Sequence, residues 1–243
     1  AQVGKVAKAT PDPAWTSLPK ADDLAAFAAQ HDQVGRGYVI GGSAWDLTNE
    51  RRVARDQLDL LVIDEAGQFS VAKTLAVGVC ARRLLLLGDP QQLPQVSTGV
   101  HAQPVDESAL GWLAAGEPVL PAHLGYFLET TRRMHPDLTT VVSDLAYDGA
   151  LTSYEQVTAA RRLDGIRPGL HVVVVDHLDN STESLEEAEA VCSLAQTLIG
   201  RMWHDPSATD GPRAPAPGGP GAPAPGRPLT ARDLIVITPY NRQ

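Results

Sequence analysis

Two apolar runs, each ending in an acidic turn, constrain the fold of this chain more than any other feature. The first is LVIDEAGQ at residues 61–68, and the second is LLLLGDPQQLP at residues 84–94. Neither apolar stretch alternates with polar residues, which is typical of central parallel strands covered on both faces. The segment between them has helical character from about Ser70 to Ala81. This order predicts a right-handed β-α-β unit in which the two strands are neighbours.

The acidic turns predict a ligand site. Asp64 and Glu65 follow the first strand, and Gly88 and Asp89 follow the second. In open α/β sheets, ligands bind at the carboxyl ends of the strands, so adjacent acids there can meet the magnesium ion of a nucleotide and an attacking water. We therefore interpret the two turns as half of an ATPase site.

Four motifs in a fixed order give a family resemblance. DEAGQ is followed by GDPQQLP, then by TRRMHP at 131–136 and ITPYNRQ at 237–243. This set resembles motifs II, III, IV and the segment before motif V of superfamily 1 helicases, which are P-loop ATPases of the AAA type. The branch it resembles is the 5′-to-3′ one, with the nonsense-mediated-decay helicases and bacterial nuclease–helicase fusions. The resemblance implies an α/β fold of two RecA-like (P-loop NTPase) lobes with parallel sheets, both incomplete.

The resemblance also divides the chain. Residues 1–35 are a connector of unknown role, residues 36–125 are the C-terminal part of the first RecA-like domain, and residues 126–243 are the N-terminal part of the second. Residues 206–228 are rich in Pro, Gly and Ala, and this composition predicts a disordered insertion. A G-x-x-x-x-G-K-[ST] loop and motifs V and VI are absent from the sequence. We therefore expect missing helicase segments, with a fused nuclease domain as a further option, in a longer parent chain.

Roles for individual residues follow from the resemblance. Asp64 would hold Mg²⁺, and Glu65 would orient and deprotonate the attacking water. Gln92 would sense the γ-phosphate of ATP and couple its loss to movement. Gln68 would connect the nucleotide to the second turn, and Asp89 is placed with the nucleotide-binding residues, with shaping of its turn as the alternative.

Two arginines of the TRRMHP motif are further candidates. Arg133 would act as an arginine finger, because a planar, permanently charged group suits a phosphate. Arg132 stands where family members carry an aromatic residue against adenine, and a guanidinium can also stack on a purine. The pair Arg161 and Arg162, in contrast, is interpreted as part of a solvated face.

Single-stranded DNA or RNA is the expected partner. The net charge of −9 argues against binding through bulk electrostatics, so contacts inside a cleft are expected instead. The candidates are Ser43, after a strand at Tyr38–Ile40, and Thr238 and Tyr240, after a strand at Leu234–Ile237. A plain strand-to-loop turn at Ser43 and a packed interface tyrosine at Tyr240 remain alternatives.

Three further elements are predicted in the second half of the chain. Val172–Val175 reads as an apolar strand, and Leu138–Leu145 has helical spacing after Pro136. Ser184 and Glu187 form a capping-box pattern before a helix that reaches Ile199. Both cysteines, Cys80 and Cys192, are predicted to be buried free thiols.

The sequence thus predicts a segment of a helicase that couples ATP hydrolysis to translocation on single-stranded DNA or RNA. The parent protein would be the active enzyme, whereas this chain alone would be inactive without the missing motifs. A cytoplasmic location and no membrane partner are expected, because there is no long apolar run and no signal peptide. Two alternatives stay open: a catalytically silent binding or scaffold module with a RecA-like fold, and a metal-dependent nuclease that uses Asp64, Glu65 and Asp89.

Overall fold

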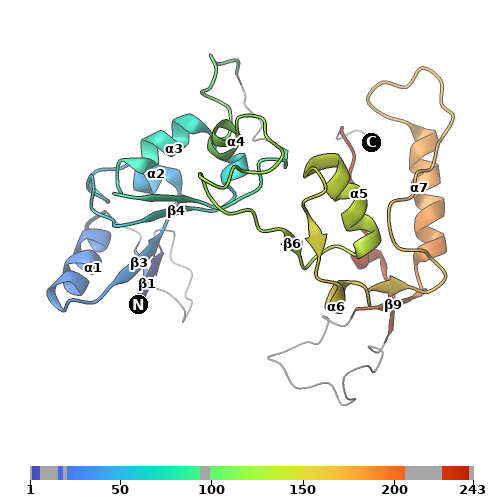
Figure 1. Cartoon of the computed structure of the whole chain (residues 1–243), viewed down its shortest axis with the longest axis horizontal. Coiled ribbons are helices and arrows are strands. Elements are labelled where there is room, and N and C mark those ends of the chain that lie inside the picture. The colour runs from blue at the N-terminus through green and yellow to red at the C-terminus, as the bar shows by residue number, and fades with distance from the viewer. Residues whose placement is uncertain (1, 6–15, 19–20, 94–98, 206–225, 241–243) are drawn as a thin grey trace. The chain divides into compact units, whose positions relative to one another are not determined.

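The chain forms two units, Ala1–Tyr126 and Phe127–Gln243 (Figure 1). The computed structural model describes residues 2–5, 16–18, 21–93, 99–205 and 226–240. The elements of the first unit are β1 (Gln2–Lys5), β2 (Thr16–Ser17), α1 (Ala21–Gln33), β3 (Tyr38–Gly41), α2 (Ala44–Leu47), β4 (Leu61–Ile63), η1 (Ala66–Gln68), α3 (Val71–Gly78), β5 (Leu84–Leu86) and α4 (Ala109–Ala114). The elements of the second unit are β6 (Thr130–Thr131), α5 (Pro136–Ala146), β7 (Thr152–Ser153), α6 (Glu155–Thr158), β8 (Arg162–Leu163), α7 (Leu185–Leu198), β9 (Met202–His204), β10 (Arg227–Pro228) and η2 (Ala231–Asp233).

Parallel pairing defines the first unit. Strand β1 lies between β2 and β3, and β4 pairs with β5 in the register Leu61↔Leu84 to Ile63↔Leu86. The prediction that the two apolar runs are neighbours is therefore confirmed. Helix α3 connects them, and it begins at Ser70, whose Oγ accepts a hydrogen bond from the amide of Lys73 at 3.3 Å. Such a cap satisfies an amide that the first helical turn leaves without a partner.

One apolar core holds the first unit together. Its buried members come from α1, β4, α3 and α4 and from the loops between them: Leu18, Leu24, Phe27, Val53, Leu61, Ile63, Ala66, Val77, Cys80 and Leu110. Leu61 and Ile63 face this core, whereas Val62, between them, is exposed. Burial raises the pKa of the Cys80 thiol, so this residue is a neutral core side chain, as predicted.

The described residues of the second unit form two small sheets. Strands β6 and β7 are parallel, and β9 lies between β8 and β10 in an antiparallel sheet. Helix α5 begins as predicted, with Pro136 in its first turn and the Nδ1 of His135 accepting the amide of Asp137 at 3.2 Å. Helix α7 also begins as predicted, because the Oγ of Ser184 accepts the amide of Glu187 at 3.2 Å.

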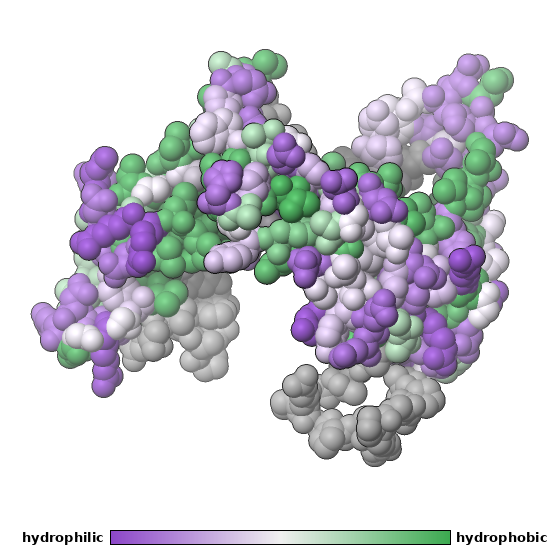
Figure 2. Space-filling view, in the orientation of Figure 1, coloured by the Kyte–Doolittle hydropathy of each residue, from purple (hydrophilic) through white to green (hydrophobic). Residues whose placement is uncertain are grey.

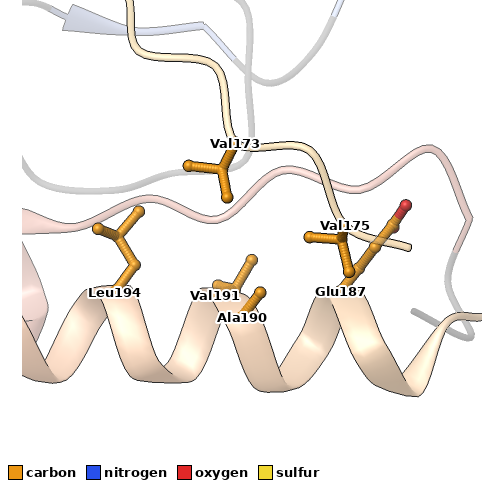
Figure 3. Close-up of a pocket in the computed structure, with 6 residues that line it drawn as sticks. All are labelled: Val173, Val175, Glu187, Ala190, Val191 and Leu194. Carbon is orange, nitrogen blue, oxygen red and sulfur yellow. The ribbon is translucent and has the colours of Figure 1, made fainter. Parts of the chain in front are cut away.

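Two predicted strands of the second unit are wrong. Residues 172–175 and 234–237 lie outside any strand, and most of their apolar side chains are exposed. An apolar run indicates a tendency to be buried, but a strand also needs a neighbour to pair with. Residues 172–175 instead run along α7, where Val173 and Val175 line an open pocket with Glu187, Ala190, Val191 and Leu194 (Figure 3).

Exposed apolar residues are therefore common in the second unit. Figure 2 shows hydrophobic surface, in green, among the polar residues. Cys192, on α7, is exposed, so the prediction that it is buried was wrong. The apolar residues of α7 have the predicted helical spacing, but none of the residues of this helix is fully buried.

The disordered insertion was predicted over residues 206–228, and its C-terminal boundary is wrong. Residues 206–225 lie outside the described part of the chain, but Arg227 and Pro228 form β10 against Met202 and Trp203. Arg227 also makes a two-point ion pair with Asp233, at 2.8 and 2.5 Å. This pair, together with hydrogen bonds from Thr230, lowers the pKa of the Asp233 carboxyl. The boundary at residue 228 was predicted from composition, which does not indicate that Arg227 pairs with Asp233.

Each unit combines helices with small sheets, parallel ones among them, which is compatible with the α/β fold expected from the sequence. In the described residues, no helix combines the length and the apolar character needed to span a membrane.

Candidate active site

Hydrogen bonds tie the two acidic turns of the first unit together. The amide of Leu87 donates to the carbonyl of Ile63 at 2.8 Å, which extends the β4–β5 ladder beyond the last paired residues. The amide of Ala66 then donates back to the carbonyl of Leu87, also at 2.8 Å. The turn after β4 is therefore fixed directly against the turn after β5, at the carboxyl ends of two parallel strands. This is the edge where ligands bind in α/β sheets.

Two glycines permit this close approach. A Cβ at Gly67 would lie 2.1 Å from the carbonyl oxygen of Asp89, and a Cβ at Gly88 would lie 2.7 Å from the amide nitrogen of Ala66. In both cases the obstacle is backbone, which cannot rotate away as a side chain can. The Gly in DEAGQ and the Gly in GDPQQLP are thus a matched pair, and each leaves room for the other turn.

This contact predicts a stability effect. Gly67→Ala should lower the free energy of unfolding by about 1–3 kcal/mol, because the methyl group forces the two turns apart. The matched control is Gly78→Ala, since a Cβ at the helical Gly78 would meet nothing within 4 Å. That variant should gain about 0.5–1 kcal/mol from helix propensity. Urea unfolding followed by circular dichroism measures both, and wild-type stability of Gly67→Ala would contradict the packing described.

The backbone at Glu65 has a conformation that L-residues rarely adopt. Its φ and ψ are 56° and 41°, in the left-handed region, and it is the residue just before η1. Such a position costs roughly 1 to 3 kcal/mol, and strained residues of this kind concentrate at active sites. The amide of Glu65 donates to the Oδ1 of Asp64 at 3.0 Å, and the carbonyl of Glu65 accepts the amide of Gln68 at 2.8 Å. Asp64, Glu65 and Gln68 all expose their side chains.

The second turn has its own hydrogen bonds. Asp89 accepts the amide of Gln91 at 3.0 Å and the Nε2 of Gln92 at 3.3 Å. These contacts favour the turn-shaping role for Asp89. The Nε2 of Gln91 reaches the carbonyls of Glu117 and Pro118, at 3.4 and 3.3 Å. Gln92 is exposed beside Asp89, so its amide group can turn toward a ligand at this edge of the sheet.

The acids of the two turns do not gather into a metal-binding cluster. Among the described residues, which include Asp64, Glu65 and Asp89, no group of three or more His, Cys, Asp or Glu side chains could hold a metal ion. A magnesium ion that arrives with a nucleotide needs only one or two protein carboxylates, because phosphate oxygens and water complete its shell. The exposed Asp64 fits that arrangement.

The two arginines of the second unit have different surroundings. The guanidinium of Arg132 lies over the ring of Tyr154, 4.2 Å from its centroid, so one face of the group is already stacked. The side chain of Arg133 is exposed, while its amide donates to the Oγ1 of Thr131 at 3.2 Å. Arg133 therefore offers an exposed cation on a backbone that is hydrogen-bonded to Thr131.

The candidate nucleic-acid residues have different surroundings. The Oγ of Ser43 donates to Asp46 at 2.6 Å, and Asp46 in turn pairs with Arg52 at 2.6 Å. Ser43 is thus the residue before helix α2, and its hydroxyl is bonded to a carboxylate. This arrangement favours the alternative that Ser43 only forms a strand-to-loop turn. Thr238 and Tyr240 are both exposed, and the hydroxyl of Thr238 donates to the carbonyl of Tyr240 at 3.0 Å.

Sequence reasoning missed Tyr154 and Arg161, both of which contact the TRRMHP turn. It interpreted Arg161 as solvated, but that side chain is only 16% exposed and is paired with Asp205. Nothing in the residues around Arg161 distinguishes it from Arg162, which is exposed. Gly88 directly follows the second apolar run, where a glycine could have indicated a close backbone approach, but Gly67 carries no such signal.

Comparisons with known proteins match the part of the chain that contains the two acidic turns. The model of a family described as an AAA domain matches residues 46–98, a range that contains both acidic turns. The chain is similar to the mouse (Mus musculus) "5'-3' DNA helicase ZGRF1", with 30% identity over 96 residues, covering 39% of this chain and 5% of the relative. It is also similar to the "Probable helicase MAGATAMA 3" of Arabidopsis thaliana, with 32% identity over 113 residues, covering 44% of this chain and 13% of the relative.

These matches, together with the ordered motifs, support the resemblance of this chain to a segment of a superfamily 1 helicase. The chain spans only a small part of the length of the curated relatives it matches.

Proposed function

We propose that this chain is a segment of a longer helicase, here called the parent protein, that couples ATP hydrolysis to movement along single-stranded DNA or RNA. In this proposal the two units belong to two RecA-like lobes. The joined turns after β4 and β5 form the part of the nucleotide site that this chain supplies, and the phosphate-gripping loop comes from elsewhere in the parent protein.

Each candidate residue has a chemical task in this proposal. Asp64 holds the magnesium ion that accompanies ATP, and this ion offsets the negative charge of the phosphates. Glu65 accepts a proton from the attacking water and orients it toward the γ-phosphate. Gln92, in the second turn, senses the γ-phosphate and couples its loss to movement, and Gln68 connects the nucleotide to this turn. Gln91, in the same turn, contacts the backbone at Glu117 and Pro118.

The second unit supplies cations to the same reaction. Arg133 stabilises the charge that spreads over the transferred phosphoryl group. Arg132 lies against the base, with Tyr154 on its other face.

Ser43, Thr238 and Tyr240 contact the nucleic-acid strand, largely at its backbone, so binding tolerates different sequences.

One observation carries the proposal. The turn with Asp64 and Glu65 and the turn with Asp89 and Gln92 are hydrogen-bonded to each other at the carboxyl ends of parallel strands, with a glycine in each at the point of contact. An acidic pair that only ended a strand would not need this fit. The family match over residues 46–98 supports the same interpretation.

The test is a comparison of ATP hydrolysis by the parent protein with and without single-stranded DNA or RNA. Hydrolysis that requires magnesium and rises severalfold with one of the strands is the expected result. Strand binding without any hydrolysis would instead favour the silent binding or scaffold module. Magnesium-dependent cutting of the strand in the absence of ATP would favour the nuclease alternative, for which the described residues provide no cluster of three acids.

A further inference from the structure

The side chain of Arg161 joins three separate parts of the second unit. Its Nε donates to the Oδ1 of Asp205 at 3.2 Å, and its Nη1 donates to the carbonyl of Arg132 at 3.1 Å and to the carbonyl of Arg133. The side chains of Arg161 and Asp205 are only 16% and 19% exposed. Charge-assisted hydrogen bonds at such a half-buried position are stronger than those between neutral groups in water.

These contacts fall on the turn that carries the two arginines of TRRMHP. Before the turn, β6 is fixed by pairing with β7, where the amide of Tyr154 donates to the carbonyl of Thr131 at 2.8 Å. After the turn, His135 begins helix α5. Arg132 and Arg133 lie between these two fixed points, and their carbonyls both accept from the same guanidinium group.

We propose that Arg161 is a positioning residue for Arg133. By holding the carbonyls of residues 132 and 133, Arg161 sets the point from which the exposed Arg133 side chain extends toward the phosphates of ATP. Asp205 accepts a hydrogen bond from the Nε of Arg161 and so fixes the orientation of its guanidinium group. This inference rests on the proposed function, because it assigns the arrangement to the stabilisation of phosphoryl transfer.

The geometry explains why arginine is needed at position 161. Its guanidinium carries separate nitrogens, so Nε can bind Asp205 while Nη1 binds the two carbonyls. A lysine keeps the charge but has a single nitrogen at the end of a flexible stem, so it cannot maintain all three contacts in one plane. A displacement of about 1 Å in a catalytic group can lower a rate roughly 100-fold.

The experiment measures ATP hydrolysis by the parent protein as a double-mutant cycle. Arg161→Lys should lower kcat about 10- to 100-fold while KM for ATP changes less than about twofold. In the Arg133→Ala background the same change should have no further effect, because the group that it positions is gone. The matched control is Arg162→Lys, at the neighbouring exposed arginine, which should hydrolyse ATP at the wild-type rate.

A second variant and a second measurement guard against simple unfolding. Asp205→Asn leaves Arg161 in place and should give a smaller fall in kcat that also disappears in the Arg133→Ala background. Hydrogen exchange of the peptide covering residues 130–135 should be faster in Arg161→Lys, whereas exchange of the β4–β5 region should stay unchanged.

Each other outcome overturns the proposal in a recognisable way. If Arg161→Lys lowers kcat by the same factor with and without Arg133, its role is general stability, and the proposed function still holds. Wild-type kcat in Arg161→Lys rejects the positioning role alone. Wild-type kcat in Arg133→Ala rejects the assigned finger itself, and the role of Arg161 is rejected with it.

Discussion

Arg133→Ala should lower the rate of ATP hydrolysis by the parent protein about 10³- to 10⁵-fold, the range over which an arginine finger acts. The reason is that the charge on the transferred phosphoryl group grows in the transition state, where a fixed guanidinium stabilises it most. The side chain of Arg133 is exposed and its backbone is anchored at Thr131 and Arg161, so removal of the side chain should leave the turn in place.

Steady-state kinetics and strand-binding titrations together test this role. Turnover should fall far more than affinity for single-stranded DNA or RNA, because the finger acts on the nucleotide. Arg232→Ala, at another exposed arginine of the second unit, removes the same charge and should have little effect on either quantity. A loss of strand affinity that exceeds the loss of turnover would show that Arg133 contacts the nucleic acid instead.

Glu65→Gln should lower ATP turnover about 10²- to 10⁴-fold while ATP binding is retained. Glutamine has nearly the same shape as glutamate but cannot accept the proton of the attacking water. The left-handed backbone at residue 65 is equally unfavourable for both side chains, so the replacement should not change the fold. The effect can then be assigned to the chemistry of the carboxylate.

Binding of a fluorescent ATP analogue and single-turnover hydrolysis separate these two quantities. Glu50→Gln is the matched control, because Glu50 is exposed and makes a long surface pair with Arg55, at 3.5 Å. Normal hydrolysis by Glu65→Gln would reject its assignment as the general base. Loss of ATP binding would instead place Glu65 among the residues that hold the nucleotide.

The sequence was sufficient to predict the elements that local patterns define. The β4-α3-β5 unit was predicted because its strands are continuous apolar runs and the segment between them has helical character. Helices α5 and α7 were predicted from Pro136 and Ser184 in the same way. In each case residues within a few positions of one another determine the structure, so the sequence contains the necessary information.

Predictions failed where distant segments decide the outcome. The runs at 172–175 and 234–237 have the composition of strands, but pairing depends on a neighbour that local sequence does not specify. Arg161 was misjudged for the same reason, since its partners lie 28 to 44 positions away along the chain. The contact between Gly67 and Asp89 is equally invisible before the two turns are placed together.

The uncovered valines and isoleucines at 172–175 and 234–237 have a practical consequence for anyone who purifies this chain. Val172, Val174, Ile235 and Ile237 expose between 79% and 88% of their surface, and neither segment is shielded by charge or proline at its centre. β-branched stretches of this kind tend to stack with identical stretches of other molecules. Solutions of the isolated polypeptide should therefore aggregate and become turbid as its concentration rises. A soluble preparation should require either a lysine placed in each stretch or the remainder of the parent protein.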